Sequence, residues 1–199
     1  NFKGSIYDRP GRRPVRNATV STIAPTGTLS IIAGCSSGVE PLFALTFVRR
    51  VMDGAELVEV NPVFEKTAKE RGVYSEGLMK EIAEHGGCTG IESVPADIQR
   101  VFVTAHDISP EWHIRMQAAF QQYTDNAVSK TVNFPHSATA KDVDKVYMLA
   151  YQLGCKGVTI YRDGSRDEQV LSTGATDKAR KAAQLAALAA ASQELAEEK

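Results

Sequence analysis

Segments that favour strands alternate with segments that favour helices along this chain, and this alternation constrains the fold more than any other feature. β-Branched residues gather at 18–24, and apolar stretches of strand length return at 42–52, 129–134 and 158–161. Stretches with helical periodicity or helix-starting residues lie between them. Because strands that alternate with helices are typical of layered α/β proteins, we predict an α/β fold.

Four helices are predicted from their start and stop signals. An Asn or Ser cap followed by Pro is a strong start, because the cap accepts a backbone N–H and Pro fixes the first φ. The third predicted helix carries Met116, Phe120 and Tyr123 on one face. The predicted helices run from Pro62 to a stop at Gly72, over 75–84, from Pro110 to about Asn126, and over 140–153.

Composition and charge exclude several functional classes. The formal net charge is −1, which provides no basic field for DNA or RNA, so we expect no nucleic-acid partner. No apolar run approaches the ~20 residues of a membrane span, so we expect no membrane association. No charged-then-apolar leader is visible at the start of the sequence. The three cysteines have no zinc or Cys-x-x-Cys spacing, so we expect a reducing cytoplasm and no metal site.

The segment Thr22 to Ser30, here called the corner, has the parts of a phosphate site. A strand leads into it, Pro25 turns the chain, and Gly27 lets a ligand approach the backbone closely. We expect residues 28–30 to present unpaired amides from a first helical turn, where the helix dipole favours an anion. Local chemistry leaves an alternative open, which is a Thr-rich turn that only caps a helix. The candidate phosphate-binding residues are Pro25, Thr26, Gly27, Thr28, Leu29 and Ser30.

Several ordered stretches resemble one family. They are Asn17–Thr19 with Thr22–Gly34 and Ser36–Pro41, then Asp107–Pro110 with His113, Gln117 and Phe120 leading into Asp125–Asn133, and Gly154–Arg162 with Gly164–Arg166 and Gln169–Leu171. Together they resemble the catalytic subunit of adenosylcobalamin-dependent (class II) ribonucleotide reductases, over residues 1–171. The remainder, 172–199, is predicted to be a linker and an Ala-rich helical tail.

The resemblance implies a fold and an activity. The fold is the second half of the ten-stranded α/β barrel of these reductases. The activity is replacement of the 2′-hydroxyl of a ribonucleoside diphosphate, or triphosphate in some members, by hydrogen, with adenosylcobalamin as the radical source. In the family, the matching Pro-Thr-Gly-Thr-Ile segment binds the substrate phosphates, and Leu29 stands here in place of Ile. A homodimer is possible for the full-length enzyme.

The sequence also lacks parts that the family needs. It contains no Asn-Pro-Cys-Gly-Glu motif, which carries the family's radical cysteine. We therefore assign no catalytic residue, and we expect this chain to need the remainder of the catalytic barrel and to be inactive alone. Two alternatives stay open: a fragment of an iron-dependent (class I) large subunit, and a non-catalytic nucleotide-binding half-barrel that assembles with another chain. The single Tyr161, where class I relatives carry a tyrosine pair, favours class II.

Other candidate residues have simpler interpretations. We expect Cys35, Cys88 and Cys155 to be packing residues, and the four histidines to lack a metal role because their spacing does not suit one. His113 resembles a family position without an assigned role. Glu40, a loop carboxylate close in sequence to the corner, and the segment 133–135 are weaker candidates for substrate contact.

Overall fold

The computed structural model describes residues 2–50 and 56–165, which divide into two compact units. The first unit contains residues 2–40, 110–132 and 139–160. The second contains the described residues among 41–109, 133–138 and 161–165. The predicted linker and Ala-rich tail, and the family-like residues beyond Ser165, lie outside the described residues.

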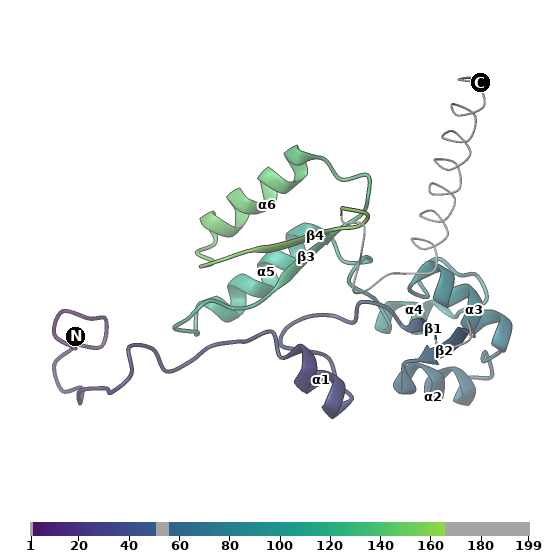
Figure 1. The fold of residues 1–199 in the computed structure, drawn as a ribbon, viewed down its shortest axis with the longest axis horizontal. Coiled ribbons are helices and arrows are strands. Elements are labelled where there is room, and N and C mark those ends of the chain that lie inside the picture. The colour runs from purple at the N-terminus through teal and green to yellow at the C-terminus, as the bar shows by residue number, and fades with distance from the viewer. Residues whose placement is uncertain (1, 51–55, 166–199) are drawn as a thin grey trace, which may run out of the picture. The chain divides into compact units, whose positions relative to one another are not determined.

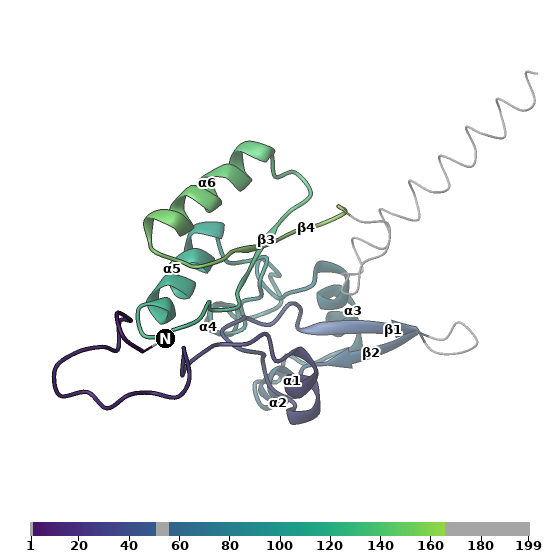
Figure 2. The same cartoon turned by 60° about the vertical axis from the view of Figure 1, so that its left-hand side comes forward.

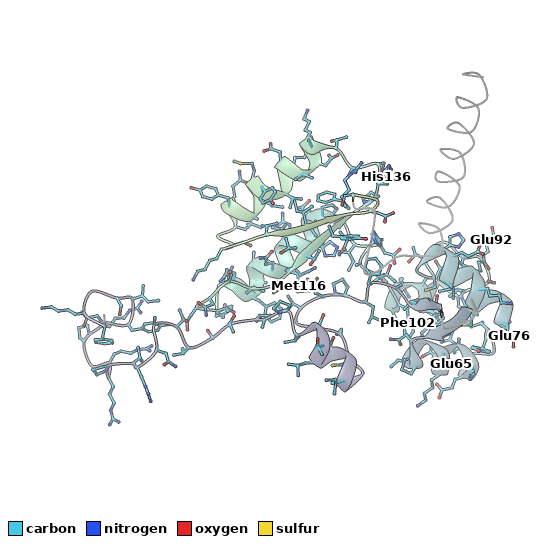
Figure 3. All side chains as sticks on the ribbon, viewed as in Figure 1. Glu65, Glu76, Glu92, Phe102, Met116 and His136 are labelled. Atoms are coloured by element: carbon cyan, nitrogen blue, oxygen red, sulfur yellow. The ribbon has the colours of Figure 1, made fainter. Side chains whose placement is uncertain are left out.

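The second unit is built around an antiparallel hairpin of β1 (Thr46–Arg50) and β2 (Glu56–Val60). Figure 2 shows the hairpin with α2 (Pro62–Glu70) and α3 (Glu76–His85) next to it, and α4 (Ala96–Val101) completes the unit. Phe64, Ile82 and Cys88 are fully buried in its core. The ring of Phe102, labelled in Figure 3, packs edge-on against Phe64 with the centroids 5.1 Å apart.

The first unit contains α1 (Gly27–Ala33), α5 (Pro110–Gln121) and α6 (Ala140–Gln152). Figure 1 shows α5 and α6 beside the paired strands β3 (Thr131–Phe134) and β4 (Thr159–Arg162). Both strands continue into segments that belong to the second unit. The apolar side chains buried on α5 and α6 are Ile114, Ala118, Val146 and Ala150.

The structure confirms the α/β prediction and most of the predicted helix starts. Asn61 caps α2, with its side chain accepting the amides of Val63 and Phe64, and Ser75 caps α3. Helix α5 begins at Pro110 but ends at Gln121, five residues before the predicted Asn126. Helix α4 and strand β2 were not predicted.

One sequence prediction is wrong in the structure. Residues 18–24 do not form a strand, because only Ile23 pairs, in an isolated parallel bridge with Val128. Met116 and Phe120 on α5, and Tyr123 just after its end, are exposed. The buried side of α5 carries three polar residues, His113, Gln117 and Gln121, together with Ile114 and Ala118.

Candidate functional site

The corner forms the predicted turn and helix start, with its free amides one residue earlier than expected. The Ser30 amide donates to the Thr26 carbonyl at 2.9 Å, which closes the first turn of α1. The amides of Gly27, Thr28 and Leu29 precede that bond, and within the described residues they donate no hydrogen bond. Three adjacent free N–H groups at a helix start are suited to an anion.

Thr26 does not cap the helix that follows it. Its Oγ1 accepts the amide of Gly38 at 3.1 Å, so it is turned toward the chain after α1 rather than toward the amides of α1. Its φ is +51°, a left-handed conformation that is strained for a β-branched residue. The capping alternative from the sequence therefore does not describe Thr26.

Gly38 makes this arrangement possible through its own backbone. Its φ is +50°, and a Cβ at this position would lie 3.1 Å from the Ala24 carbonyl oxygen. The loop after α1, residues 34–40, thus folds back onto the chain that enters the corner. A glycine is required there both for the conformation and for the close approach.

The remaining candidate residues of the corner are accessible. Pro25, Gly27, Thr28 and Leu29 are exposed, and a Cβ added at Gly27 meets no atom within 4 Å. The Ser30 hydroxyl donates to the Gly27 carbonyl at 2.6 Å and is therefore occupied within the turn. What the corner offers a ligand is its backbone, with the Thr28 hydroxyl beside it.

A buried lysine lies in the same unit as the corner. The Lys130 side chain is 1% exposed, and its Nζ donates to Glu40 Oε2 at 2.6 Å, His113 Nδ1 at 2.7 Å and the Thr131 carbonyl at 2.6 Å. These three acceptors match the three N–H bonds of an ammonium group. Burial lowers the pKa of Lys130, and the Glu40 carboxylate opposes that shift.

Two glutamines of α5 fix the segments that lead into β3 and β4. Gln117 is fully buried, and its Nε2 donates to the carbonyls of Val128 at 3.0 Å and Gly157 at 2.6 Å. Gln121 donates to the carbonyls of Thr124 and Asn126, and its Oε1 accepts the Val128 amide. These bonds explain why α5 buries polar residues.

Asp125 joins the same region to the chain that enters the corner. Its Oδ2 accepts the amides of Val20 at 2.9 Å and Ser21 at 3.1 Å, and the Ser21 hydroxyl accepts the Asp125 amide. A pocket of about 420 Å³ lies beside these contacts, lined by residues 22–25, 127–130 and 157–159. Sequence reasoning missed Lys130, Gln117 and Asp125 as site-building residues; they lay inside the family-like stretches, but only their contacts reveal what they hold.

The other sequence candidates do not gather into a second site. Cys35 is exposed, Cys88 is buried and Cys155 is half-buried. No group of three or more His, Cys, Asp or Glu side chains among residues 2–50 and 56–165 is placed to hold a metal ion. In the same part of the chain, no helix has the length and apolarity of a membrane span.

Comparisons with known proteins identify where this architecture occurs. Residues 6–161 match the family model described as the ribonucleotide reductase barrel domain. A vitamin B12-dependent ribonucleoside-diphosphate reductase from Thermoplasma acidophilum is 51% identical over 174 residues, covering 87% of this chain and 22% of the relative. A protein of the same name from Mycobacterium tuberculosis is 49% identical, covering 87% of this chain and 25% of the relative.

A solved structure supports the fold. The class Id ribonucleotide reductase alpha subunit of Actinobacillus ureae aligns with a TM-score of 0.63 and 26% identity, covering 82% of this chain and 28% of that chain. The chain thus spans about a quarter of the length of the relatives that it matches.

Proposed function

Because this chain belongs to the ribonucleotide reductase family, in its barrel domain, we propose that it forms part of a catalytic barrel that converts ribonucleotides to 2′-deoxyribonucleotides. Within that barrel, we propose that its corner holds the substrate phosphates. The observation that carries the proposal is that Thr26 Oγ1 accepts from Gly38 instead of capping α1, so that the amides of residues 27–29 have no acceptor within the described residues.

The free amides suit a diphosphate physically. A hydrogen bond to a charged group contributes about 1.5–3 kcal/mol, so three converging amides and the Thr28 hydroxyl provide substantial affinity without a lysine. The exposed, uncrowded backbone at Gly27 allows a phosphate oxygen to approach. The role of this chain is to bind and orient the phosphates, so that the sugar of the substrate is fixed relative to the reacting groups.

We propose adenosylcobalamin as the cofactor, because relatives about half identical to this chain are named vitamin B12-dependent ribonucleoside-diphosphate reductases. When bound, this cofactor supplies a radical by homolysis of its cobalt–carbon bond. The described residues offer no cluster of metal-ligating side chains that fits its cobalt, so we assign none of them to it. An iron-dependent class I fragment is the alternative, and the names of these relatives favour cobalamin over it.

We further propose that activity needs the remainder of the barrel. The sequence lacks the Asn-Pro-Cys-Gly-Glu motif that carries the family's radical cysteine, and the chain spans 22% and 25% of its two B12-dependent relatives. Under this proposal the substrate is a ribonucleoside diphosphate or triphosphate, the complete enzyme is a possible homodimer, and it acts in the cytoplasm. If the chain gives no activity in any complete barrel, the non-catalytic half-barrel becomes the better description.

A chimera tests the proposal. The matching 174-residue segment of the Thermoplasma acidophilum reductase is replaced by this chain, and reduction of ADP and CDP is assayed with and without adenosylcobalamin. We expect activity that depends on the cofactor. Gly27→Val and Thr28→Pro should raise the KM for the diphosphate about tenfold or more while leaving cobalamin affinity nearly unchanged. Cofactor-independent activity would remove the cobalamin assignment, and an unchanged KM in both variants would remove the phosphate assignment.

A further inference from the structure

The buried ion pair connects the loop after α1 to two other elements of the first unit. Glu40 is the last residue of that loop within the unit, and its Oε2 accepts from Lys130. Its Oε1 accepts the amide of Thr131, the first residue of β3, at 2.5 Å. Lys130 also donates to His113 on α5. One carboxylate therefore fixes the end of the loop to the start of β3 and, through the lysine, to α5.

The fixed end of the loop lies two residues from the contact that shapes the corner. The Glu40 amide donates to the Ser37 carbonyl at 2.9 Å, which makes residues 37–40 a tight turn. The Gly38 amide, inside that turn, donates to Thr26 Oγ1. A displacement of Glu40 would therefore move the donor that holds Thr26 in its left-handed conformation.

We propose that Glu40 is a positioning residue for the phosphate corner. Held by Lys130 and the Thr131 amide, its carboxylate fixes the 37–40 turn, and the Gly38 amide then holds Thr26 so that the amides of residues 27–29 converge. The ligand in this proposal rests on the proposed function; the positioning itself does not.

The chemistry of the pair supports a geometric role. Burying a lysine and a carboxylate is costly, and apolar residues of similar volume often stabilise a fold as well or better. The pair instead fixes the orientation of the groups around it, because both carboxylate oxygens and all three ammonium hydrogens take part in hydrogen bonds in a single arrangement. An apolar replacement would fill the space without fixing the turn.

The test uses the full 199-residue chain and the variant Glu40→Gln, with Glu65→Gln as the matched control. Glu65 also pairs with a lysine, Lys69, but at an exposed site on α2 of the second unit. Amide hydrogen exchange is followed without ligand. We expect exchange across 26–40 to accelerate about tenfold in Glu40→Gln and to stay unchanged in the control. Unchanged exchange across 26–40 in a folded Glu40→Gln would overturn the positioning role.

A second variant keeps the test decisive if Glu40→Gln does not fold. If Glu40→Gln unfolds the first unit, Glu40→Leu with Lys130→Met removes both charges together and retains the packing. We expect this double variant to fold and still to show accelerated exchange at 26–40, because apolar contacts do not direct the turn. A folded double variant with wild-type exchange in the corner would overturn the proposal.

Inorganic pyrophosphate is the probe that separates this proposal from the proposed function. We expect Glu40→Gln and Thr26→Val each to weaken pyrophosphate binding about tenfold. A variant that combines these two substitutions should bind little worse than either alone, because both act through the same turn. Additive losses would contradict the connection through Gly38. A wild-type chain that does not bind pyrophosphate counts against the phosphate site, while the exchange experiment still decides the positioning role.

Discussion

The Nζ atom of Lys130 lies 2.6 Å from Oε2 of Glu40, a residue ninety positions earlier in the chain. This contact joins the loop after α1 to the start of β3 at a site where the lysine is 1% exposed and the carboxylate 21%. Because the lysine has no access to water, its charge depends on the acceptors around it. Removing only one member of the pair should therefore destabilise the first unit.

Lys130→Met should destabilise the first unit by about 3–5 kcal/mol, because it removes the ammonium that donates to the Glu40 carboxylate and to the Thr131 carbonyl. Urea unfolding followed by the fluorescence of Trp112, the chain's single tryptophan, reports on this unit because Trp112 lies on α5. Lys69→Met, at an exposed pair, should change stability by less than about 1 kcal/mol. Equal losses of stability in the two variants would show that the Lys130–Glu40 pair contributes no more to stability than the exposed Lys69–Glu65 pair.

Gln117→Leu should cost about 2–4 kcal/mol, because it deprives the carbonyls of Val128 and Gly157 of the Gln117 donor. The matched control is Gln122→Leu, at an exposed position just after α5, which should change stability by less than about 0.5 kcal/mol. Both are measured by urea unfolding. A Gln117→Leu variant as stable as the wild type would mean that Gln117 does not hold the segments that lead into β3 and β4.

Gly38→Ala should weaken the corner more than Gly34→Ala. Both glycines have positive φ, so both alanines carry a similar conformational cost of about 1 kcal/mol. Only at Gly38 does the new Cβ also meet backbone, the Ala24 carbonyl, whereas Gly34 has no atom within 4 Å. Thermal unfolding and exchange at 26–40 should therefore separate the two variants, and identical behaviour would contradict the packing of the loop on the corner.

The cysteines should differ in reactivity. Burial raises the pKa of Cys88 to about 11, whereas Cys35 is exposed. At pH 8, a thiol with a pKa near 11 is roughly one part in a thousand thiolate, and the thiolate is the reactive form. Timed alkylation with iodoacetamide and peptide mass spectrometry should find Cys35 modified well before Cys88. Faster labelling of Cys88 in the native chain would contradict its burial.

Acid should weaken the start of α6 within a defined pH range. Hydrogen bonds from Thr139, with the nearby Lys145 ammonium, lower the pKa of Asp142 from 3.8 to about 2. Because the pKa of Asp142 is lower in the folded state than in the unfolded state, its carboxylate stabilises the fold when the pH is above the unfolded-state pKa. This stabilisation is lost as the pH falls from about 4 toward 2. Asp142→Asn should reduce the pH dependence of unfolding in this range. Thr139 and Asp142 form a capping box, in which each side chain accepts the other's backbone amide. An unchanged profile would show that this capping box does not contribute to acid stability.

The sequence predicted local features well because local residues determine them. Asn61 and Ser75 cap their helices through their own neighbouring amides, and Gly86 ends α3 in a left-handed conformation. The strand predicted at 18–24 failed because a strand needs partners along its length, and here only Ile23 pairs with Val128.

The residues that hold the candidate site together, such as Lys130 and Gln117, could not be predicted from the sequence. Helical periodicity grouped Met116 and Phe120 on one face of α5, but both are exposed. The buried residues of α5 are His113, Ile114, Gln117, Ala118 and Gln121. The Lys130 ammonium bonds to His113 Nδ1, and the Gln117 side-chain amide donates to the carbonyl of Gly157, forty residues away. No local sequence pattern reveals these contacts. The turn and helix start of the corner were predicted from the sequence, but the amides without an acceptor among the described residues are those of 27–29 rather than 28–30.

Binding of phosphate by the corner can be followed at its own amides. An ¹⁵N-labelled full chain is titrated with ADP and with inorganic pyrophosphate, and amide shifts are recorded by NMR. We expect saturable shifts at Gly27, Thr28 and Leu29 with both ligands, and the same set of amides with each, because the diphosphate is the shared group. Saturable shifts elsewhere in the chain with these three amides unmoved would contradict phosphate binding by the corner.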